Sequence, residues 1–299
     1  MGKDYFNIVC FGEILWDILP NGAKPGGAPV NVAFHLNQLG QKPAVISRIG
    51  NDQRGATLKE LMDRKQIATT FLQQDPIYET GVVYAKPDEN NNMSYEIKQP
   101  VAWDYIESNE SQAIITKGSD YFIFGSLAAR SPCSHKTLFE LLEQANNKVL
   151  DINLRAPHYN KSLILDLINR SDIVKLNEDE LELVTGWFSK YTDLNDRINQ
   201  LQDHFKIATL IVTLGAKGAI LRQNGKTYVH PGYKVIVEDT VGSGDAFLAA
   251  FLTKSIEGDS PAGALNFAAA VGATVAANAG AWVTFTREAV ENILLKTVS

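Results

Sequence analysis

The chain has 299 residues, of which 45% are apolar and 21% are charged, a composition typical of globular proteins. Its formal net charge is −6, so bulk electrostatics give no reason to expect nucleic acid or an anionic membrane surface as a partner. Cys10 and Cys133 are far apart and lack CxxC or metal-ligand spacing, which predicts reduced thiols in a cytoplasmic protein. The N-terminus lacks the pattern of a signal peptide.

Short runs rich in β-branched and aromatic residues alternate with longer amphipathic stretches along most of the chain. The predicted strands are Tyr5–Gly12, Lys42–Ile49, Tyr121–Gly125, Lys148–Ile152, Asp172–Leu176 and Leu210–Thr213. The predicted helices are Asn31–Leu39, Arg54–Lys65, His135–Ala145, Lys161–Asn169 and Glu178–Val184. This alternation predicts βαβ units, and therefore an α/β fold with a mainly parallel sheet covered on both faces.

Two stretches interrupt the alternation. Glu13–Gly27 is short and rich in turn residues, and Tyr78–Lys98 contains two strand-like runs around a polar tip at residues 87–92. The second pattern predicts a hairpin. Together the two stretches predict a small β-sheet at the edge of the main domain, which could serve as a lid over a binding site. Its other face would need cover, which favours a homodimer through this sheet.

The segment Ala262–Val283 is rich in Ala and Gly. Ser260 and Pro261 before it are typical of a helix start, with Pro at the first helical position. Asn266 and Asn278 interrupt the segment and make its transfer into lipid unfavourable. We therefore expect a tightly packed helix inside the protein and no association with a membrane.

The strongest chemical signal lies in Asp239–Phe247, which reads DTVGSGDAF. Apolar residues at helical spacing follow it, so the Gly-Ser-Gly triplet is expected at a helix N-terminus, where free N–H groups and the positive end of the helix dipole bind anions. Asp245 beside such a site could accept a proton from a hydroxyl nucleophile, or could simply cap the helix. The segment matches neither the Walker A motif nor the dinucleotide-binding pattern.

This segment resembles the C-terminal signature of the ribokinase-like (pfkB-type) carbohydrate kinases, usually written DTxGxGD. Four other segments resemble family motifs in the same order and spacing: Gly26–Ala33, Arg48–Asp52, Asn177–Glu180 and Thr213–Gly218. The resemblance covers essentially the whole chain. It implies one kinase domain over residues 1–299, folded as a three-layer α/β/α sandwich, with lid segments at about residues 13–30 and 76–100.

The resemblance also implies the reaction centre. Asp245 corresponds to the catalytic base and would contact the acceptor hydroxyl of the substrate. The backbone N–H groups of Gly242, Ser243 and Gly244 correspond to an anion hole that stabilises charge on the transferring phosphoryl group.

ATP and Mg²⁺ are the implied co-substrate and metal. Asn177 corresponds to a residue that organises the ATP phosphates, and Glu180 to one that holds Mg²⁺ through water, which suits a cation that keeps several waters. The alternative for Glu180 is a carboxylate on a helix surface. Thr213, Gly215 and Gly218 correspond to the turn that borders the nucleotide.

The family match assigns two further groups of residues. Asp17, Gly26, Gly27 and Asn31 correspond to sugar contacts, since Asp and Asn can each hold a pair of hydroxyl groups; the alternative is an ordinary turn. Arg155 could reach a substrate or phosphate oxygen, or could form an ion pair with Asp151 or another acid. A monovalent cation, often K⁺ in the family, would be bound by Asp239, Val241 and Gly280.

Four segments resemble the bacterial fructokinase branch in particular: Gly12–Asp17, Gly26–Pro29, Phe124–Ala128 and Asp151–Arg155. Two features depart from that branch, Ile152 in place of Pro and the absence of Pro from residues 280–284. The expected reaction is the transfer of phosphate from ATP to a primary hydroxyl of fructose, giving fructose 6-phosphate.

Other functions remain open on the sequence alone. A 2-keto-3-deoxy sugar acid would need a cation such as Arg155, and a nucleoside would need an apolar slot that Trp16, Phe34 or Trp103 could supply. Ribose is a third alternative substrate. A catalytically silent sugar-sensing protein on the same fold is the alternative from another class.

Overall fold

Buried strands form the central sheet: β1 (Ile8–Phe11) and β4 (Pro43–Gly50) are buried at every residue. The structure, a computed structural model, describes residues 6–20, 22–87 and 93–295. It divides into two compact units. The first unit comprises Met1–Phe122 and Ala128–Asn146, and the second comprises Ile123–Leu127 and Asn147–Ser299.

The central sheet has nine strands in the hydrogen-bonded order β13-β12-β11-β10-β9-β8-β1-β4-β5. The pairs β1–β4, β4–β5, β9–β10 and β10–β11 are parallel, and β11–β12 and β12–β13 are antiparallel. The mainly parallel sheet predicted from the sequence is confirmed. Its other strands are β5 (Leu72–Asp75), β8 (Tyr121–Gly125), β9 (Asn147–Asp151), β10 (Ile173–Asn177), β11 (Thr209–Thr213), β12 (Ala219–Gln223) and β13 (Lys226–His230).

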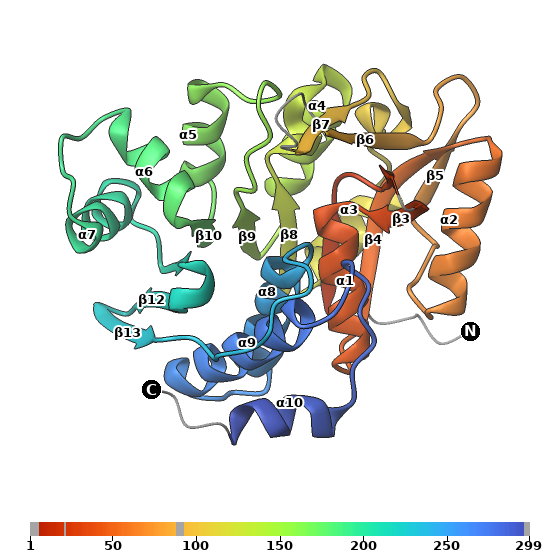
Figure 1. Cartoon of the computed structure of the whole chain (residues 1–299). Helices are drawn as coiled ribbons and strands as arrows, with labels where there is room; N and C mark the ends of the chain where they lie inside the picture. The colour runs from red at the N-terminus through yellow and green to blue at the C-terminus, as the bar shows by residue number, and fades with distance from the viewer. Residues whose placement is uncertain (1–5, 21, 88–92, 296–299) are drawn as a thin grey trace. The chain divides into compact units, whose positions relative to one another are not determined.

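Helices pack against the strands in each unit (Figure 1). In the first unit, α1 contacts β1 and β4; in the second, α6 and α7 contact β11, and α9 contacts β12 and β13. The helices are α1 (Ala28–Gln38), α2 (Gln53–Arg64), α3 (Glu110–Gly118), α4 (Pro132–Leu142), α5 (Lys161–Asn169), α6 (Glu178–Gly186), α7 (Leu194–Phe205), α8 (Ser243–Ile256), α9 (Pro261–Ala276) and α10 (Arg287–Leu294). Within the described residues, the short 3₁₀ helices are η1 (Ala102–Tyr105), η2 (Leu127–Arg130) and η3 (Gly215–Lys217).

A separate four-stranded sheet, here called the lid sheet, belongs to the first unit. Its order is β3-β2-β6-β7, with β2 and β6 parallel and the two outer pairs antiparallel. The small sheet predicted from the two interrupting stretches is therefore confirmed, whereas most of the hairpin tip, residues 88–92, lies outside the described residues. Its strands are β2 (Leu15–Leu19), β3 (Gly22–Gly26), β6 (Gly81–Pro87) and β7 (Met93–Ile97).

The Ala-rich helix begins where the sequence predicts but ends earlier. Ser260 caps α9 by accepting a hydrogen bond from the Gly263 N–H at 3.1 Å. The predicted extension to residue 283 is wrong, because α9 ends at Ala276. Directly after that end, Nδ2 of Asn278 donates to the Thr274 carbonyl at 2.8 Å, so a side chain takes up a carbonyl of the last turn.

Helices α8 and α9 lie side by side. A Cβ on Gly272 would stand only 3.3 Å from the Ser243 carbonyl and 3.5 Å from Cβ of Phe247. The small residues of α9 therefore allow the close packing that the sequence predicts. None of the helices in the described part of the chain combines the length and hydrophobicity that crossing a bilayer requires.

Candidate active site

The Gly-Ser-Gly triplet forms the start of α8, as its sequence predicts. Gly242 is the N-cap residue in the left-handed conformation, with φ of 77°, and a Cβ there would lie 2.6 Å from Cα of Ala281. Only glycine meets both conditions without strain. Ser243, Gly244 and Asp245 then occupy the first helical positions. The Ser243 N–H donates to the Thr240 carbonyl at 3.3 Å, a long hydrogen bond that a stronger acceptor could replace.

The Asp245 side chain is half-buried in the first turn of α8. A carboxylate at this position lies beside the free N–H groups and the positive end of the helix dipole. The turn before it has no side chain at Gly242 or Gly244 to block an incoming anion. This combination of an anion-binding helix start and an adjacent proton acceptor is what phosphoryl transfer to a hydroxyl requires.

Asp239 holds together the three residues predicted to bind a monovalent cation. Its Oδ1 accepts from the Val241 N–H at 3.0 Å, and its Oδ2 accepts from the Gly280 N–H at 2.9 Å. Oδ1 thus closes the turn just before α8, and Oδ2 fixes that turn to the segment after α9. The structure brings Asp239, Val241 and Gly280 together.

Asn177 and Thr213 are direct neighbours at the carboxyl ends of two parallel strands, β10 and β11. Asn177 also caps α6: its Oδ1 accepts from the Glu180 N–H at 2.8 Å, and Glu180 Oε2 accepts from the Asn177 N–H at 2.9 Å. This reciprocal pair is a capping box. Because ligands of open α/β sheets bind at the carboxyl ends of strands, both residues lie at the expected edge.

Glu180 is a buried residue, 8% exposed, and not the surface carboxylate considered as an alternative. Its second oxygen, Oε1, accepts from the Leu154 N–H at 2.7 Å. Burial raises the pKa of Glu180, and the hydrogen bonds from Asn177 and Leu154 only partly oppose that effect. Through the hydrogen bonds from Leu154 and Asn177, the Glu180 carboxylate joins the loop after β9 to the start of α6.

The carboxylate oxygens of Glu180 and Asp245, both in the second unit, are ligands of the kind that a hard cation bound together with a nucleotide prefers. In the described residues, no group of three or more His, Cys, Asp or Glu side chains is placed to enclose a metal ion. Mg²⁺ needs no such cage, because it keeps several waters and binds through one or two carboxylates together with substrate phosphates. Glu180 and Asp245 fit this mode of binding.

Gly215 and Gly218 lie in the tight turn after β11. The Leu214 N–H donates to the Gly218 carbonyl at 2.8 Å, and a Cβ on Gly218 would collide with the His230 carbonyl. The turn therefore keeps its backbone close to β13. It follows Thr213 directly, so these three predicted nucleotide residues share one edge of the second unit.

One buried ion pair of the second unit was missed by sequence reasoning. Nζ of Lys175 lies 2.9 Å and 2.7 Å from the two carboxylate oxygens of Asp151, and both side chains are 7% exposed. The alternative partner proposed for Asp151 was Arg155, which is exposed and forms no ion pair within the described residues. The feature of the sequence that could have indicated this ion pair is Lys175 itself, a charged residue within the apolar run of β10.

The predicted sugar residues belong to the first unit. A Cβ on Gly26 would collide with the Asp17 carboxylate, so β2 and β3 bring these two residues together. Gly27, with φ of 112°, is the N-cap residue of α1, and a Cβ there would collide with the Glu13 carbonyl. Asn31, in the first turns of α1, is buried.

Glu13 was not assigned a role from the sequence. The residue is 2% exposed, and its Oε1 accepts from the Ala28 N–H at 3.1 Å. A carboxylate at a helix N-terminus is favourable. Glu13 therefore fixes the start of α1, where two of the predicted sugar residues, Gly27 and Asn31, lie.

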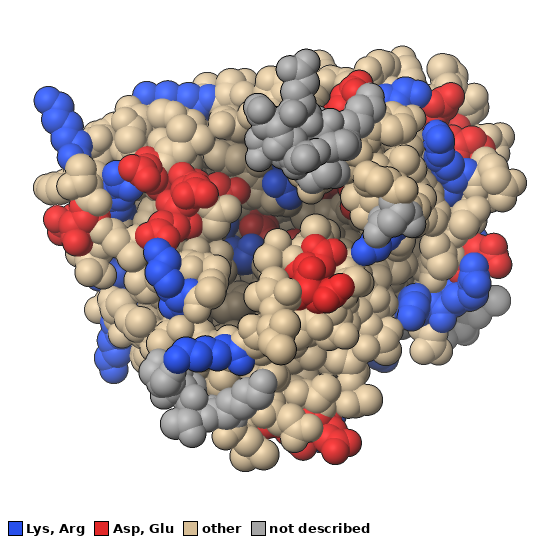
Figure 2. All heavy atoms as spheres, viewed as in Figure 1, with Lys and Arg blue, Asp and Glu red and all other residues tan. Residues whose placement is uncertain are grey.

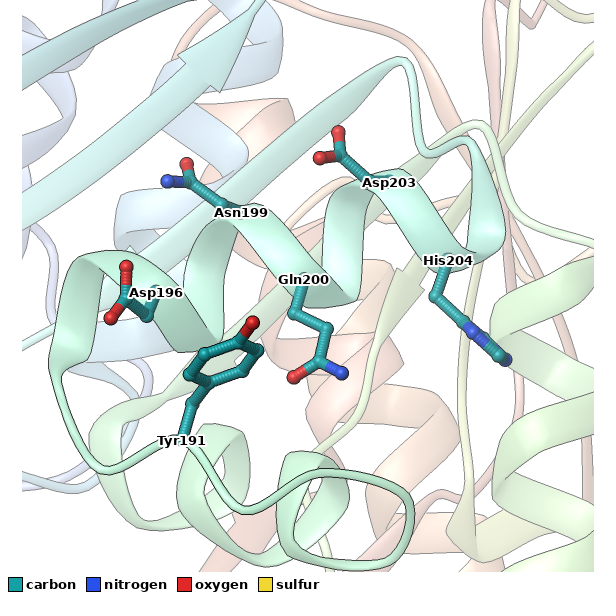
Figure 3. Close-up of a pocket in the computed structure, with 6 residues that line it drawn as sticks. All are labelled: Tyr191, Asp196, Asn199, Gln200, Asp203 and His204. Atoms are coloured by element: carbon teal, nitrogen blue, oxygen red, sulfur yellow. The ribbon is translucent and has the colours of Figure 1, made fainter.

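Two surface features lie outside the predicted site: the distribution of charged side chains and a hollow along α7. On the face seen in Figure 2, basic and acidic side chains are interspersed. Figure 3 shows a hollow along α7, lined by polar side chains of that helix and by Tyr191. None of its lining residues belongs to the predicted site.

Comparison with known proteins identifies the family to which this site belongs. Residues 20–285 match the model of the pfkB family carbohydrate kinases. The chain belongs to the pfkB family of carbohydrate kinases. The matched region contains the start of α8, the α6 cap residue Asn177, the turn after β11 and most of the lid sheet. The fold and the kinase class predicted from the sequence are therefore confirmed.

Relatives of this pfkB kinase cover most of its length. A probable chloroplastic fructokinase-6 of Arabidopsis thaliana is 31% identical over 97% of this chain and 83% of its own length. A fructokinase of Escherichia coli is 28% identical over 81% of this chain and 82% of its own. The crystal structure of a Vibrio cholerae O395 fructokinase, bound to fructose, ADP and calcium, superimposes with a TM-score of 0.84 and 25% identity, over 97% and 99% of the two chains.

Proposed function

We propose that this pfkB kinase transfers the γ-phosphoryl group of ATP to a primary hydroxyl of fructose, giving fructose 6-phosphate and ADP. The observation that carries this proposal is the position of Asp245, in the first turn of α8 and directly after the Gly-Ser-Gly turn. The similarity to fructokinases of plants and bacteria supports the choice of sugar.

In this reaction Asp245 accepts the proton of the sugar hydroxyl while its oxygen attacks the γ-phosphorus. An O–P bond to the sugar forms as the bond between the γ-phosphorus and the bridging oxygen of ADP breaks. The N–H groups at Gly242–Gly244 receive the negative charge on the transferring group, which preorganised backbone donors stabilise more effectively than water.

The remaining site residues have separate tasks. Asp17, Gly26, Gly27 and Asn31 hold the sugar hydroxyls, and Arg155 is available to a substrate or phosphate oxygen. Asn177, Thr213, Gly215 and Gly218 border the nucleotide.

Two cations complete the proposed site. Mg²⁺ would be held by the ATP phosphates with Glu180 through water, and it would neutralise phosphate charge. K⁺ would be bound near Asp239, Val241 and Gly280, whose spacing is fixed by the hydrogen bonds that the Val241 and Gly280 N–H groups donate to Asp239.

We also propose that the lid sheet excludes water during transfer and joins two chains into a homodimer. Tyr95 of β7, a strand at the sheet edge, is 60% exposed, and an exposed aromatic on an edge strand favours a protein contact. Sedimentation at several concentrations would test this; a monomer at every concentration would refute the dimer. The single kinase domain and the cytoplasmic location remain predictions.

The Asp245→Asn variant tests the proposed base. The amide keeps the shape of the side chain but cannot accept the proton, so we expect turnover to fall by a factor of about 10² or more while ATP binding is retained. Asp203→Asn, in the hollow of Figure 3 on α7, is the matched control and should leave turnover unchanged. Near-normal turnover by folded Asp245→Asn would refute the assignment.

A further inference from the structure

Lys175 is an ammonium group inside a buried parallel strand. Lys175 lies directly opposite Asp151 in the register of β10 and β9, two strands that lie side by side (Figure 1). Both carboxylate oxygens of Asp151 accept from its Nζ. Among the described residues no other acceptor contacts Nζ, so two of its three N–H groups are used and one remains.

The same ammonium lies against the start of α8. A Cβ on Gly244 would stand 3.3 Å from Nζ of Lys175 and 3.8 Å from its Cε. Gly244 belongs to the anion-binding turn and directly precedes Asp245. The lysine therefore borders the place where a phosphate bound at the helix start would lie.

The charges around Lys175 keep it protonated. Burial by itself lowers the pKa of Lys175, but the Asp151 carboxylate and its hydrogen bonds, with smaller effects from Asp245 and Glu180, raise it above the ordinary value. A buried ion pair alone is a poor source of stability, because desolvation offsets most of the attraction. A charged lysine at this place suits a site that receives an anion.

We infer that Lys175 is a phosphate-binding residue, which donates its remaining N–H to the terminal phosphoryl group of the nucleotide at the start of α8. Asp151 is then a positioning residue that holds the ammonium toward Gly244. The inference rests on the proposed kinase function and adds a side-chain cation to the backbone donors of the anion hole. Such charge-assisted hydrogen bonds are the strong ones in phosphate recognition.

The test compares binding of Mg-ATP and AMP by calorimetry, because AMP lacks both the β-phosphoryl and the terminal γ-phosphoryl group. Lys175→Met alone would leave Asp151 buried without a partner and could unfold the protein. The main variant is therefore Lys175→Met with Asp151→Asn, which removes both charges. Lys254→Met is the matched control, since Lys254 lies at the other end of α8 and pairs with Glu257.

We expect the double variant to bind ATP about 10- to 100-fold more weakly, with AMP affinity changed by less than about twofold. The Lys254→Met variant should bind both nucleotides like the wild type. Asp151→Asn alone, which keeps the ammonium but loosens its position, should lose part of the preference for ATP and serves as the second test if the double variant does not fold.

Unchanged ATP affinity in the folded variants, or equal weakening of ATP and AMP, would overturn the role of Lys175. Sugar phosphorylation by the wild-type protein is measured in parallel. If the wild type prefers ATP to AMP but phosphorylates no sugar, the proposed function fails, and the binding ratio of the variants still decides the role of Lys175.

Discussion

The Asp52 carboxylate joins the start of α2 to the start of the lid strand β6. Its Oδ1 accepts from the Gly55 N–H and from the Thr80 hydroxyl, each at 2.8 Å, and its Oδ2 accepts from the Thr80 N–H at 2.7 Å. Thr80 is fully buried, and its hydroxyl also accepts from the Gly50 N–H at 3.0 Å. One side chain thus satisfies both a helix N-terminus and a buried backbone donor.

Replacing Asp52 by Ala removes all three hydrogen bonds. Loss of the helix cap costs about 1 kcal/mol, and leaving the buried Thr80 N–H without an acceptor costs about 1–3 kcal/mol. We therefore expect the free energy of unfolding to fall by about 2–4 kcal/mol. Asp193→Ala is the control: Asp193 caps α7 with hydrogen bonds from exposed N–H groups only, so its loss should cost about 1 kcal/mol.

The assay is urea unfolding followed by circular dichroism at pH 7 and at decreasing pH. Burial raises the pKa of Asp52, but the Thr80 and Gly55 donors outweigh it and lower the pKa below its ordinary value. The contribution of Asp52 is therefore complete above about pH 4 and is lost as the pH falls through the lowered pKa. Equal losses for Asp52→Ala and Asp193→Ala, or an Asp52 effect that persists in strong acid, would refute this account.

Three further outcomes are expected. Gly27→Ala should reduce the free energy of unfolding by about 2–4 kcal/mol in urea titrations, because φ of 112° and the Glu13 carbonyl both oppose a Cβ. Gly186→Ala is the control and should be neutral, because a Cβ at Gly186 would meet open space. EDTA should abolish ADP production and Mg²⁺ should restore it; activity that survives EDTA would contradict the proposed role of the metal. Replacing K⁺ by Na⁺ should lower the rate of ADP production by the wild type in a coupled assay, whereas the rate of Asp239→Asn should change little. Equal changes in the two rates would refute the proposed cation site.

Local sequence patterns predicted the features of the site that depend on neighbouring residues. The Gly-Ser-Gly turn and the apolar helix after it place Asp245 in the first turn of α8, because helix starts are determined by a few adjacent residues. Ser260 and Pro261 gave the start of α9 for the same reason, and the helix Lys161–Asn169 has the predicted bounds.

Contacts between distant residues could not be predicted in this way. The Asp52–Thr80 hydrogen bonds and the Lys175–Asp151 pair depend on strand register and on packing between elements, which one sequence does not encode locally. Strands β5, β12 and β13 and helices α3, α7 and α10 were not predicted. Several are polar or exposed, as in β13, but Leu194, Ile198 and Leu201 do have the helical spacing that could have indicated α7.

The most direct test of the proposed function is ADP release by the purified protein with Mg-ATP and K⁺. The sugars and related substrates to compare are fructose, ribose, 2-keto-3-deoxygluconate, glucose, mannose and adenosine. We expect strong release with fructose, and loss of that release in Asp245→Asn. Turnover of another compound in preference to fructose would contradict the proposed substrate, and silence with every compound from folded protein that binds ATP would contradict the proposed activity.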